Sequence, residues 1–218
     1  MTKMGVFFDM DGVVADSMKF HVAAWQSAFG ELGYSVPDEE IYRREGMSGP
    51  ASVLDIFHAL GADTPGEEEL ACLIDRKHHF FYDFSIPLYD EIEDILCSLH
   101  EEGVTLALVT GSHHGAVEKI MPSHLRSLFT AIVTSEEVTM GKPHKEPYCT
   151  ALERCGTSRE NSLVVENAPM GIASAKAAGL FCVALETTLS GDDLKGADRI
   201  ISTHGELRNF LLKYLREI

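Results

Sequence analysis

The chain has 218 residues, of which 45% are hydrophobic and 24% charged, the composition of a globular protein large enough for one sizeable domain, with or without a smaller insert. Its formal net charge of −16 argues against nucleic acid or an anionic membrane as a partner, but it is compatible with a small anion held by local cations. The five cysteines include no C-x-x-C pair, and no signal peptide or membrane-length apolar run is recognisable, so we expect free thiols and a cytoplasmic location.

The first predicted element is a short buried strand at 6–8, which is followed by a long segment with helical periodicity only. In this segment, 16–84, apolar residues recur at helical spacing over 22–32 and 53–60, and a third helical pattern covers 67–84. Turn signals containing glycine and proline separate the three patterns. We interpret residues 16–84 as a small helical-bundle cap domain inserted after the first strand.

From about residue 86 onward, strands and helices alternate. Helical patterns cover 90–102 and 169–179. Continuous apolar runs, typical of strands buried on both faces, lie at 104–110, 131–134, 163–165, 181–185 and 199–201. This alternation predicts an α/β core with a doubly wound, Rossmann-like parallel sheet, built from residues 1–15 and 85–218.

Two acids, Asp9 and Asp11, follow the first strand directly. Ligands of open parallel sheets bind outside the carboxyl ends of the strands, so both acids lie at the favoured edge. Their spacing aims both carboxylates at one space, where they repel each other unless a cation or a proton intervenes. The pair therefore indicates a functional site at this edge.

Three further loops are predicted to reach the same edge. Thr110, Gly111 and Ser112 end a strand before a helix, where they serve either as an ordinary helix start or as a binding site for a phosphate or oxyanion. Lys142 lies between a glycine and a proline, and Glu166 and Asn167 end the next strand.

The ordered set DMDGVVADS, VTGS, GKPHKEPY and VVENAPMGIASAKAAGL resembles the haloacid dehalogenase superfamily. Within it the chain is similar to the helical-cap phosphatases and β-phosphoglucomutases. The resemblance implies that Asp9 is the nucleophile that forms an aspartyl-phosphate, with Asp11 as general acid and base. It further implies that Thr110, with Gly111 and Ser112 nearby, holds the phosphoryl group and that Lys142 balances the charge.

The resemblance also implies a Mg²⁺ site built from Asp9, the backbone carbonyl of Asp11, and Asn167, with Glu166 as a ligand or outer-shell neighbour. Relatives usually carry an aspartate where this chain has Asn167. An amide oxygen still binds Mg²⁺, but one negative charge is lost. We therefore expect a weaker metal site unless another carboxylate compensates.

The cap offers three residues that the resemblance brings near the site: His21, Lys77 and Glu45. Glu45, in the loop REGMSG, is either a solvated acid in a turn or a group that faces the metal. In the second case it favours a small, metal-chelated substrate such as pyrophosphate. His21 is alternatively a histidine packed on a helix face.

The sequence thus predicts a Mg²⁺-dependent phosphohydrolase, a monomer or weak dimer, that acts on a small phosphorylated metabolite or pyrophosphate. One alternative is a sugar-phosphate mutase, although the segment Ser48–Gly49–Pro50 lacks the arginine with which such mutases grip a second phosphate. The other alternative is a non-catalytic phosphate-binding protein.

Overall fold

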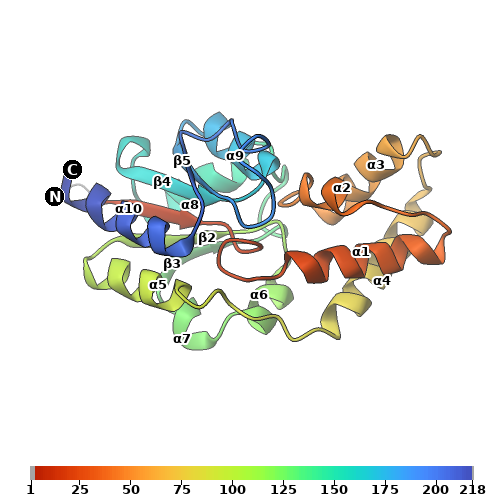
Figure 1. Cartoon of the computed structure of the whole chain (residues 1–218), viewed down its shortest axis with the longest axis horizontal. Helices are drawn as coiled ribbons and strands as arrows, with labels where there is room; N and C mark the ends of the chain where they lie inside the picture. Colours follow the sequence, from red (N-terminus) through yellow and green to blue (C-terminus); the bar gives the residue numbers. More distant parts are fainter. Residues whose placement is uncertain (1–2, 218) are drawn as a thin grey trace.

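Six parallel strands form a single sheet in the computed structural model of the chain, which describes residues 3–217 (Figure 1). The order is β3-β2-β1-β4-β5-β6, with bounds Gly5–Phe8 (β1), Thr105–Val109 (β2), Phe129–Val133 (β3), Ser162–Glu166 (β4), Phe181–Leu185 (β5) and Arg199–Ile201 (β6). Residues 1–2 and 218 of the predicted core segments lie outside the described residues.

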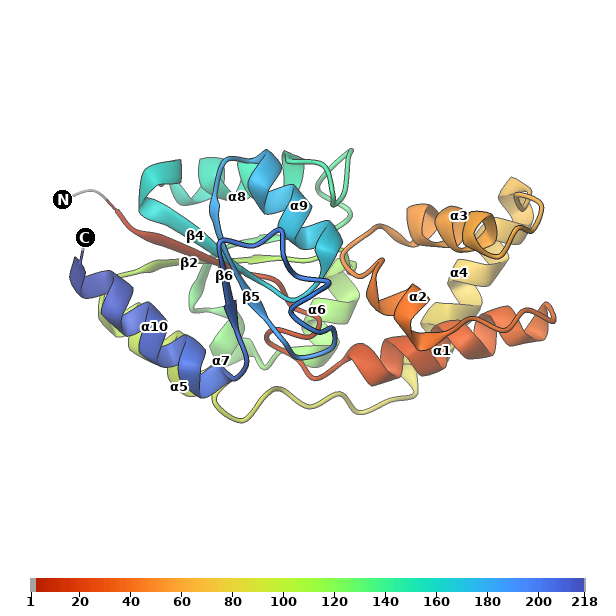
Figure 2. The same cartoon turned by 45° about the horizontal axis from the view of Figure 1, so that its top comes forward.

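Strands β1, β2 and β4 are buried on both faces, as their continuous apolar runs predict, whereas the edge strands β3 and β6 keep exposed residues. Val6 and Phe8 of β1 point into one hydrophobic cluster, and Phe7 between them points into another on the opposite face. Helices α5 (Ile92–Glu101) and α10 (His204–Glu217) cover the first face, while α8 (Glu146–Cys155) and α9 (Pro169–Ala177) cover the second (Figure 2). The predicted α/β fold class is confirmed.

The remaining helices of the core connect the strands. Their bounds are His114–Ile120 (α6), Ser123–Arg126 (α7), Glu146–Cys155 (α8), Pro169–Ala177 (α9), and a short 3₁₀ turn at Arg159–Asn161. Helix α9 begins at a proline, whose fixed φ angle suits the first position of a helix. This helix leads away from the strand end that carries Glu166 and Asn167.

The segment between β1 and the rest of the core is helical and has its own hydrophobic cluster. It contains α1 (Met18–Glu31), α2 (Asp38–Tyr42), α3 (Gly49–Ala59) and α4 (Glu67–Tyr82), which Figures 1 and 2 show as a group beside the core. The short helix α2 was not predicted, because its sequence has the composition of a turn. Three acids in its first turn stabilise it by complementing the helix dipole. We call α1–α4 the cap; its bounds at 16 and 84 stay a prediction.

Among the residues that the structure describes, no helix has both the length and the apolar character needed to cross a membrane.

The aromatic cluster of the cap makes its stability testable. The ring of Phe57 is buried and lies 5.6 Å from that of Phe29 and 5.1 Å from that of Tyr34, between ring centroids. We expect Phe57→Ala to lower the free energy of unfolding of the cap by about 3–5 kcal/mol, because the change leaves a cavity. Urea denaturation followed by the fluorescence of Trp25, the one tryptophan of the sequence, measures this.

Leu54→Ala on the same helix is the matched control. Leu54 is 40% exposed, so its truncation should change the free energy of unfolding by no more than about 0.5 kcal/mol. Equal effects of the two substitutions would contradict the assignment of Phe57 to the cap core.

Candidate active site

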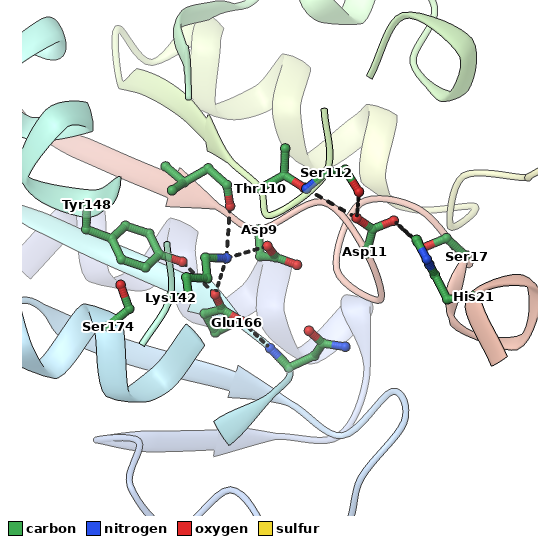
Figure 3. Close-up of polar contacts among 12 residues, drawn as sticks. Asp9, Asp11, Ser17, His21, Thr110, Ser112, Lys142, Tyr148, Glu166 and Ser174 are labelled. Atoms are coloured by element: carbon green, nitrogen blue, oxygen red, sulfur yellow. Dashed lines mark hydrogen bonds and ion pairs between the residues drawn. The ribbon is translucent and has the colours of Figure 1, made fainter. Parts of the chain in front are cut away.

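Side chains from separate strand ends meet at the carboxyl edge of the sheet (Figure 3). Asp9 follows β1, Thr110 follows β2, and Glu166 is the last residue of β4. The parallel register brings these ends level with one another. Lys142 reaches the same place from the loop that precedes α8.

The Lys142 ammonium lies buried between two carboxylates. It donates hydrogen bonds to Asp9 Oδ1 (2.5 Å), Glu166 Oε1 (2.6 Å) and the carbonyl oxygen of Val109 (3.0 Å). All three ammonium hydrogens therefore have acceptors. Burial alone would lower the pKa of Lys142, but the two carboxylates outweigh it and raise this pKa above its usual value, so the ammonium stays charged.

Glu166 is held entirely by protein groups. Its Oε1 also accepts a hydrogen bond from the Tyr148 hydroxyl (2.7 Å), and its Oε2 accepts one from the backbone N–H of Asn167 (3.1 Å). Burial and Glu166 raise the pKa of Tyr148 well above its usual value, so the tyrosine remains a donor. Glu166, predicted as a metal ligand or its neighbour, thus has both oxygens directed to Lys142, Tyr148 and the backbone.

Two buried oxygens at this edge have no hydrogen-bond partner among the described residues: Asp9 Oδ2 and Asn167 Oδ1. Burial raises the pKa of Asp9 well above its ordinary value; Lys142 opposes this rise, whereas Glu166 and Asp11 add to it. An unpaired buried acceptor costs free energy, and a cation coordinated by oxygen would remove that cost. The donor set fits Mg²⁺, which prefers carboxylate and carbonyl oxygens.

Asp11 is buried and accepts hydrogen bonds from both the core and the cap. Its Oδ1 is bonded to the Ser17 hydroxyl (2.7 Å) and to His21 Nε2 (2.9 Å), and its Oδ2 accepts from the hydroxyls of Ser112 (2.9 Å) and Thr110 (3.3 Å). Burial by itself would raise the pKa of Asp11, but His21 and the two serine hydroxyls outweigh it and lower this pKa.

The three predicted cap residues all face Asp11. Asp11, His21 and Glu45 each offer one atom that could bind a metal ion, and these three atoms lie within 4.8 Å of one another. Burial raises the pKa of Glu45 despite the opposing charges of His21 and Lys77. The Lys77 ammonium lies 4.7 Å from the ring centroid of Phe81, and burial lowers its pKa although Glu45 and Asp11 oppose this.

A cavity of about 300 Å³ lies between cap and core, with His21, Glu45, Lys77, Gly111 and Ser112 in its wall. Its apolar lining from the cap comprises Trp25, Ile41, Met47, Ile56, Ile74 and Phe81. The cap and the core touch at the edge of the cavity, where a methyl group on Gly111 would lie 2.5 Å from the carbonyl oxygen of Gly46. Glycine at position 111 therefore permits this close approach of the cap loop.

Several groups of the site were not predicted. Tyr148 and Ser17 make buried hydrogen bonds to Glu166 and Asp11. Thr188 Oγ1 accepts a hydrogen bond from Asn167 Nδ2 (3.3 Å), and Thr187 Oγ1 donates one to the carbonyl oxygen of Gly12 (2.6 Å). Both threonines follow β5, so the rule that ligands gather at the carboxyl ends of strands would have found them. No comparable signal marks Tyr148.

Two histidine rings contact each other in the wall of the cavity. His78 of α4 and His113 of the core line the cavity, and their ring centroids are 4.8 Å apart. Burial lowers the pKa of His78 to about 4 and also lowers that of His113. The two rings are therefore neutral at pH 7 and close the cavity without adding charge.

Comparison with known proteins agrees with this geometry. The family model for haloacid dehalogenase-like hydrolases matches residues 6–185. The chain is 29% identical to the validoxylamine A 7'-phosphate phosphatase of Streptomyces hygroscopicus subsp. limoneus over 203 residues, which cover 92% of this chain and 94% of that protein. It is 28% identical to the β-phosphoglucomutase of Bacillus subtilis (strain 168) over 218 residues, with 95% and 92% covered.

A solved structure of a proposed β-phosphoglucomutase from Bacteroides vulgatus is also similar. It matches with a TM-score of 0.88 and 28% identity over 99% of this chain and 90% of that one. The chain therefore belongs to the haloacid dehalogenase-like hydrolases, and it is an enzyme of their phosphatase type. The resemblance read from the four motifs is confirmed.

The charge of Asp11 depends on His21, and this dependence can be measured. We expect His21→Ala to raise the pKa of Asp11, because the largest contribution that opposes burial is then lost. Titration of the aspartate carboxyl carbons by NMR in Mg²⁺-free buffer measures this pKa. In the wild type, the folded-state pKa lies below that of free aspartate, so ionised Asp11 stabilises the fold above about pH 4, and this contribution is lost as the pH falls further.

His124→Ala serves as the control, because the side chain of His124 is 62% exposed and pairs only with Glu93 in the described structure. This variant should leave the titration of Asp11 unchanged. An unaltered Asp11 pKa in His21→Ala would refute the electrostatic role assigned to His21.

Proposed function

We propose that this enzyme is a Mg²⁺-dependent phosphohydrolase that acts on a small phosphorylated substrate through an aspartyl-phosphate on Asp9. The observation that carries the proposal is the state of the Asp9 carboxylate. Lys142 holds one of its oxygens, while the other is buried and has no protein partner among the described residues. A carboxylate oriented in this way is a competent nucleophile once cations neutralise the phosphoryl group that it attacks.

Mg²⁺ is proposed to bind between Asp9 and Asn167, together with the backbone carbonyl of Asp11. The two unpartnered oxygens of Asp9 and Asn167 support this choice. When bound, the ion would neutralise the oxygens of the transferring phosphoryl group. Glu166 is better interpreted as the anchor of Lys142 than as a ligand, because protein donors already occupy both of its oxygens.

The reaction is proposed to run in two steps. In the first, an oxygen of Asp9 forms a bond to phosphorus, the bond from phosphorus to the leaving oxygen breaks, and the leaving oxygen gains a proton. In the second, water attacks the same phosphorus, which restores the Asp9 carboxylate and releases phosphate. Lys142 offsets the negative charge that develops in both steps. The hydroxyls of Thr110 and Ser112, which donate to Asp11 in the structure, would turn to the phosphoryl oxygens when substrate is bound.

Asp11 and His21 are proposed to carry the proton. Their 2.9 Å contact between Nε2 and Oδ1 requires one hydrogen between the two groups. To act as the acid, the pair must carry one proton more than neutral His21 and ionised Asp11, and this additional proton would go to the leaving oxygen in the first step. Ionised Asp11 is then ready to accept a proton from the attacking water in the second step.

Hydrolysis is favoured over transfer between two positions of a sugar. A mutase needs a cation for the second phosphate of its bisphosphate intermediate, and Ser48–Gly49–Pro50 offers none. Arg44 lines the cavity, but its guanidinium already donates to Asp55 (2.6 Å) and to the Glu40 carboxylate (2.7 Å). Its charge is therefore largely offset. Lys77 also lies in the cavity wall, but burial lowers the pKa of its ammonium, and Glu45 opposes its charge.

A small substrate, pyrophosphate in particular, is favoured by the position of Glu45. The carboxylate lies in the cavity wall beside Asp11 and His21, where it repels an extended anion but tolerates one chelated to a metal ion. It also restores to the site the negative charge that Asn167 lacks.

The nucleophile is tested by Asp9→Asn. We expect the wild type to release phosphate only with Mg²⁺ and the variant to be slower by at least about a thousandfold, because the amide cannot form the phospho-enzyme. Phosphate release is measured with and without EDTA on pyrophosphate and a set of hexose phosphates. Chromatography of the sugar products shows whether phosphate is released or moved between hydroxyls.

Asp63→Asn makes the same chemical change at an exposed position of the cap and should retain full activity. Turnover by Asp9→Asn at the wild-type rate would disprove the nucleophile. Transfer between hydroxyls without release would favour the mutase, and binding without any turnover would favour a non-catalytic phosphate-binding protein.

The role of Glu45 is tested separately by Glu45→Ala. We expect a Mg²⁺ requirement that is severalfold higher and a larger loss of activity on pyrophosphate than on hexose phosphates, because a negative charge leaves the site. Steady-state rates over a Mg²⁺ titration measure both effects. Glu68→Ala, which removes an exposed acid of the cap, is the control; if Glu45→Ala matches it, the proposed role of Glu45 is wrong.

A further inference from the structure

Asn167 raises a problem that an aspartate in its place would not. A carboxylate presents two equivalent oxygens, whereas an amide presents an oxygen at one end and an N–H donor at the other. Only the oxygen can coordinate a cation. If the amide turns over about its last torsion angle, it directs hydrogens at the ion instead, so a metal site with Asn167 needs a group that selects one orientation.

The structure contains such a group in Thr188. Its Oγ1 accepts a hydrogen bond from Asn167 Nδ2 (3.3 Å), and Asn167 Oδ1 is left buried and without a protein partner among the described residues. Thr188 is partly exposed, so its own hydroxyl hydrogen can bond to solvent while its oxygen accepts from the amide. The nitrogen end of the amide is thereby engaged and the oxygen end is free.

The position of Thr188 follows from the sheet. Strand β5 is the direct neighbour of β4, with Glu166 paired to Ala184, so the loop after β5 passes beside Asn167. Thr187 fixes this loop, since its hydroxyl donates to the carbonyl oxygen of Gly12 (2.6 Å). Two successive threonines therefore connect the loops that follow β1, β4 and β5.

Gly12 confines the amide from the other side. Its φ angle is 86°, a left-handed conformation that favours glycine, and a methyl group there would lie 2.0 Å from Asn167 Nδ2. The nitrogen end of the amide is thus packed between the backbone of Gly12 and the hydroxyl of Thr188.

We propose that Thr188 is a positioning residue that holds the Asn167 amide with its oxygen free to coordinate Mg²⁺. The inference rests on the proposed Mg²⁺ dependence and assigns to this chain a device for using a neutral amide as a metal ligand. Thr188 touches neither the phosphoryl group nor the nucleophile and acts through Asn167 alone.

The test measures Mg²⁺ binding rather than turnover. Isothermal titration calorimetry with Mg²⁺ alone is applied to the wild-type chain of 218 residues, Thr188→Val and Thr188→Ser. We expect Thr188→Val, which keeps the shape but loses the acceptor, to bind Mg²⁺ about threefold to tenfold more weakly, the worth of one hydrogen bond. Thr188→Ser keeps the hydroxyl and should bind within about twofold of the wild type.

The substitution Asn167→Asp supplies the decisive background. Either oxygen of an aspartate can face the ion, so adding Thr188→Val to Asn167→Asp should weaken Mg²⁺ binding by less than about twofold. Thermal denaturation without Mg²⁺ checks that all variants fold, and the Mg²⁺-induced rise of the melting temperature gives an independent measure of binding.

The outcomes separate the two proposals. Wild-type affinity in Thr188→Val, or an equal loss of affinity with and without the Asn167→Asp substitution, would overturn the positioning role while leaving Mg²⁺ dependence intact. A wild type that binds no Mg²⁺ at millimolar concentration would instead contradict the proposed function and remove the basis of this inference.

Discussion

The site depends on one buried cation, the Lys142 ammonium, held between the carboxylates of Asp9 and Glu166. Removing a buried partner from such an arrangement leaves an uncompensated charge, which is costly in a low-dielectric interior. Here the negative charge is only partly compensated, because one ammonium faces two carboxylates. Glu166 is satisfied by Tyr148 and the backbone, so the remaining deficit falls on Asp9, the residue whose reactivity the proposed chemistry requires.

Asp11 links this charged centre to the cap. Donors from the core, Thr110 and Ser112, and donors from the cap side of the chain, Ser17 and His21, share its two oxygens. The hydrogen bonds therefore add to the apolar contacts between cap and core, since Ala24 and Phe81 of the cap belong to a hydrophobic cluster of the core. A movement of the cap that takes His21 away from Asp11 would raise the pKa of that carboxyl, so the position of the cap and the affinity of Asp11 for a proton are coupled.

Much of the fold and of the catalytic edge could be predicted from the sequence because it depends on local periodicity. Continuous apolar runs identify buried parallel strands, and the residues that follow them share an edge, which brings Asp9, Thr110 and Asn167 together. Lys142 lies in a loop without periodicity, and the family resemblance was needed to assign it. The inward position of Glu45 depends on how the cap packs, which no local pattern encodes. The contacts of Glu166 and Asn167 could not be predicted for a related reason: both residues end one strand, but their partners come from other loops and depend on the three-dimensional arrangement of the edge.

Glu166 and Asn167 are therefore adjacent in sequence but have different partners in the structure. Because of this difference, the acid and the amide have distinct roles. The acid neutralises Lys142 and thereby limits how much of the ammonium charge Asp9 receives. The amide contributes an oxygen without a charge, so it does not increase the excess of buried negative charge at the proposed metal site. If Asn167 were an aspartate, the core would carry that charge permanently. With the amide, the additional carboxylate near Asp11 is Glu45, which belongs to the cap. The negative charge that would favour the proposed metal-chelated substrate is therefore complete only when cap and core are in contact.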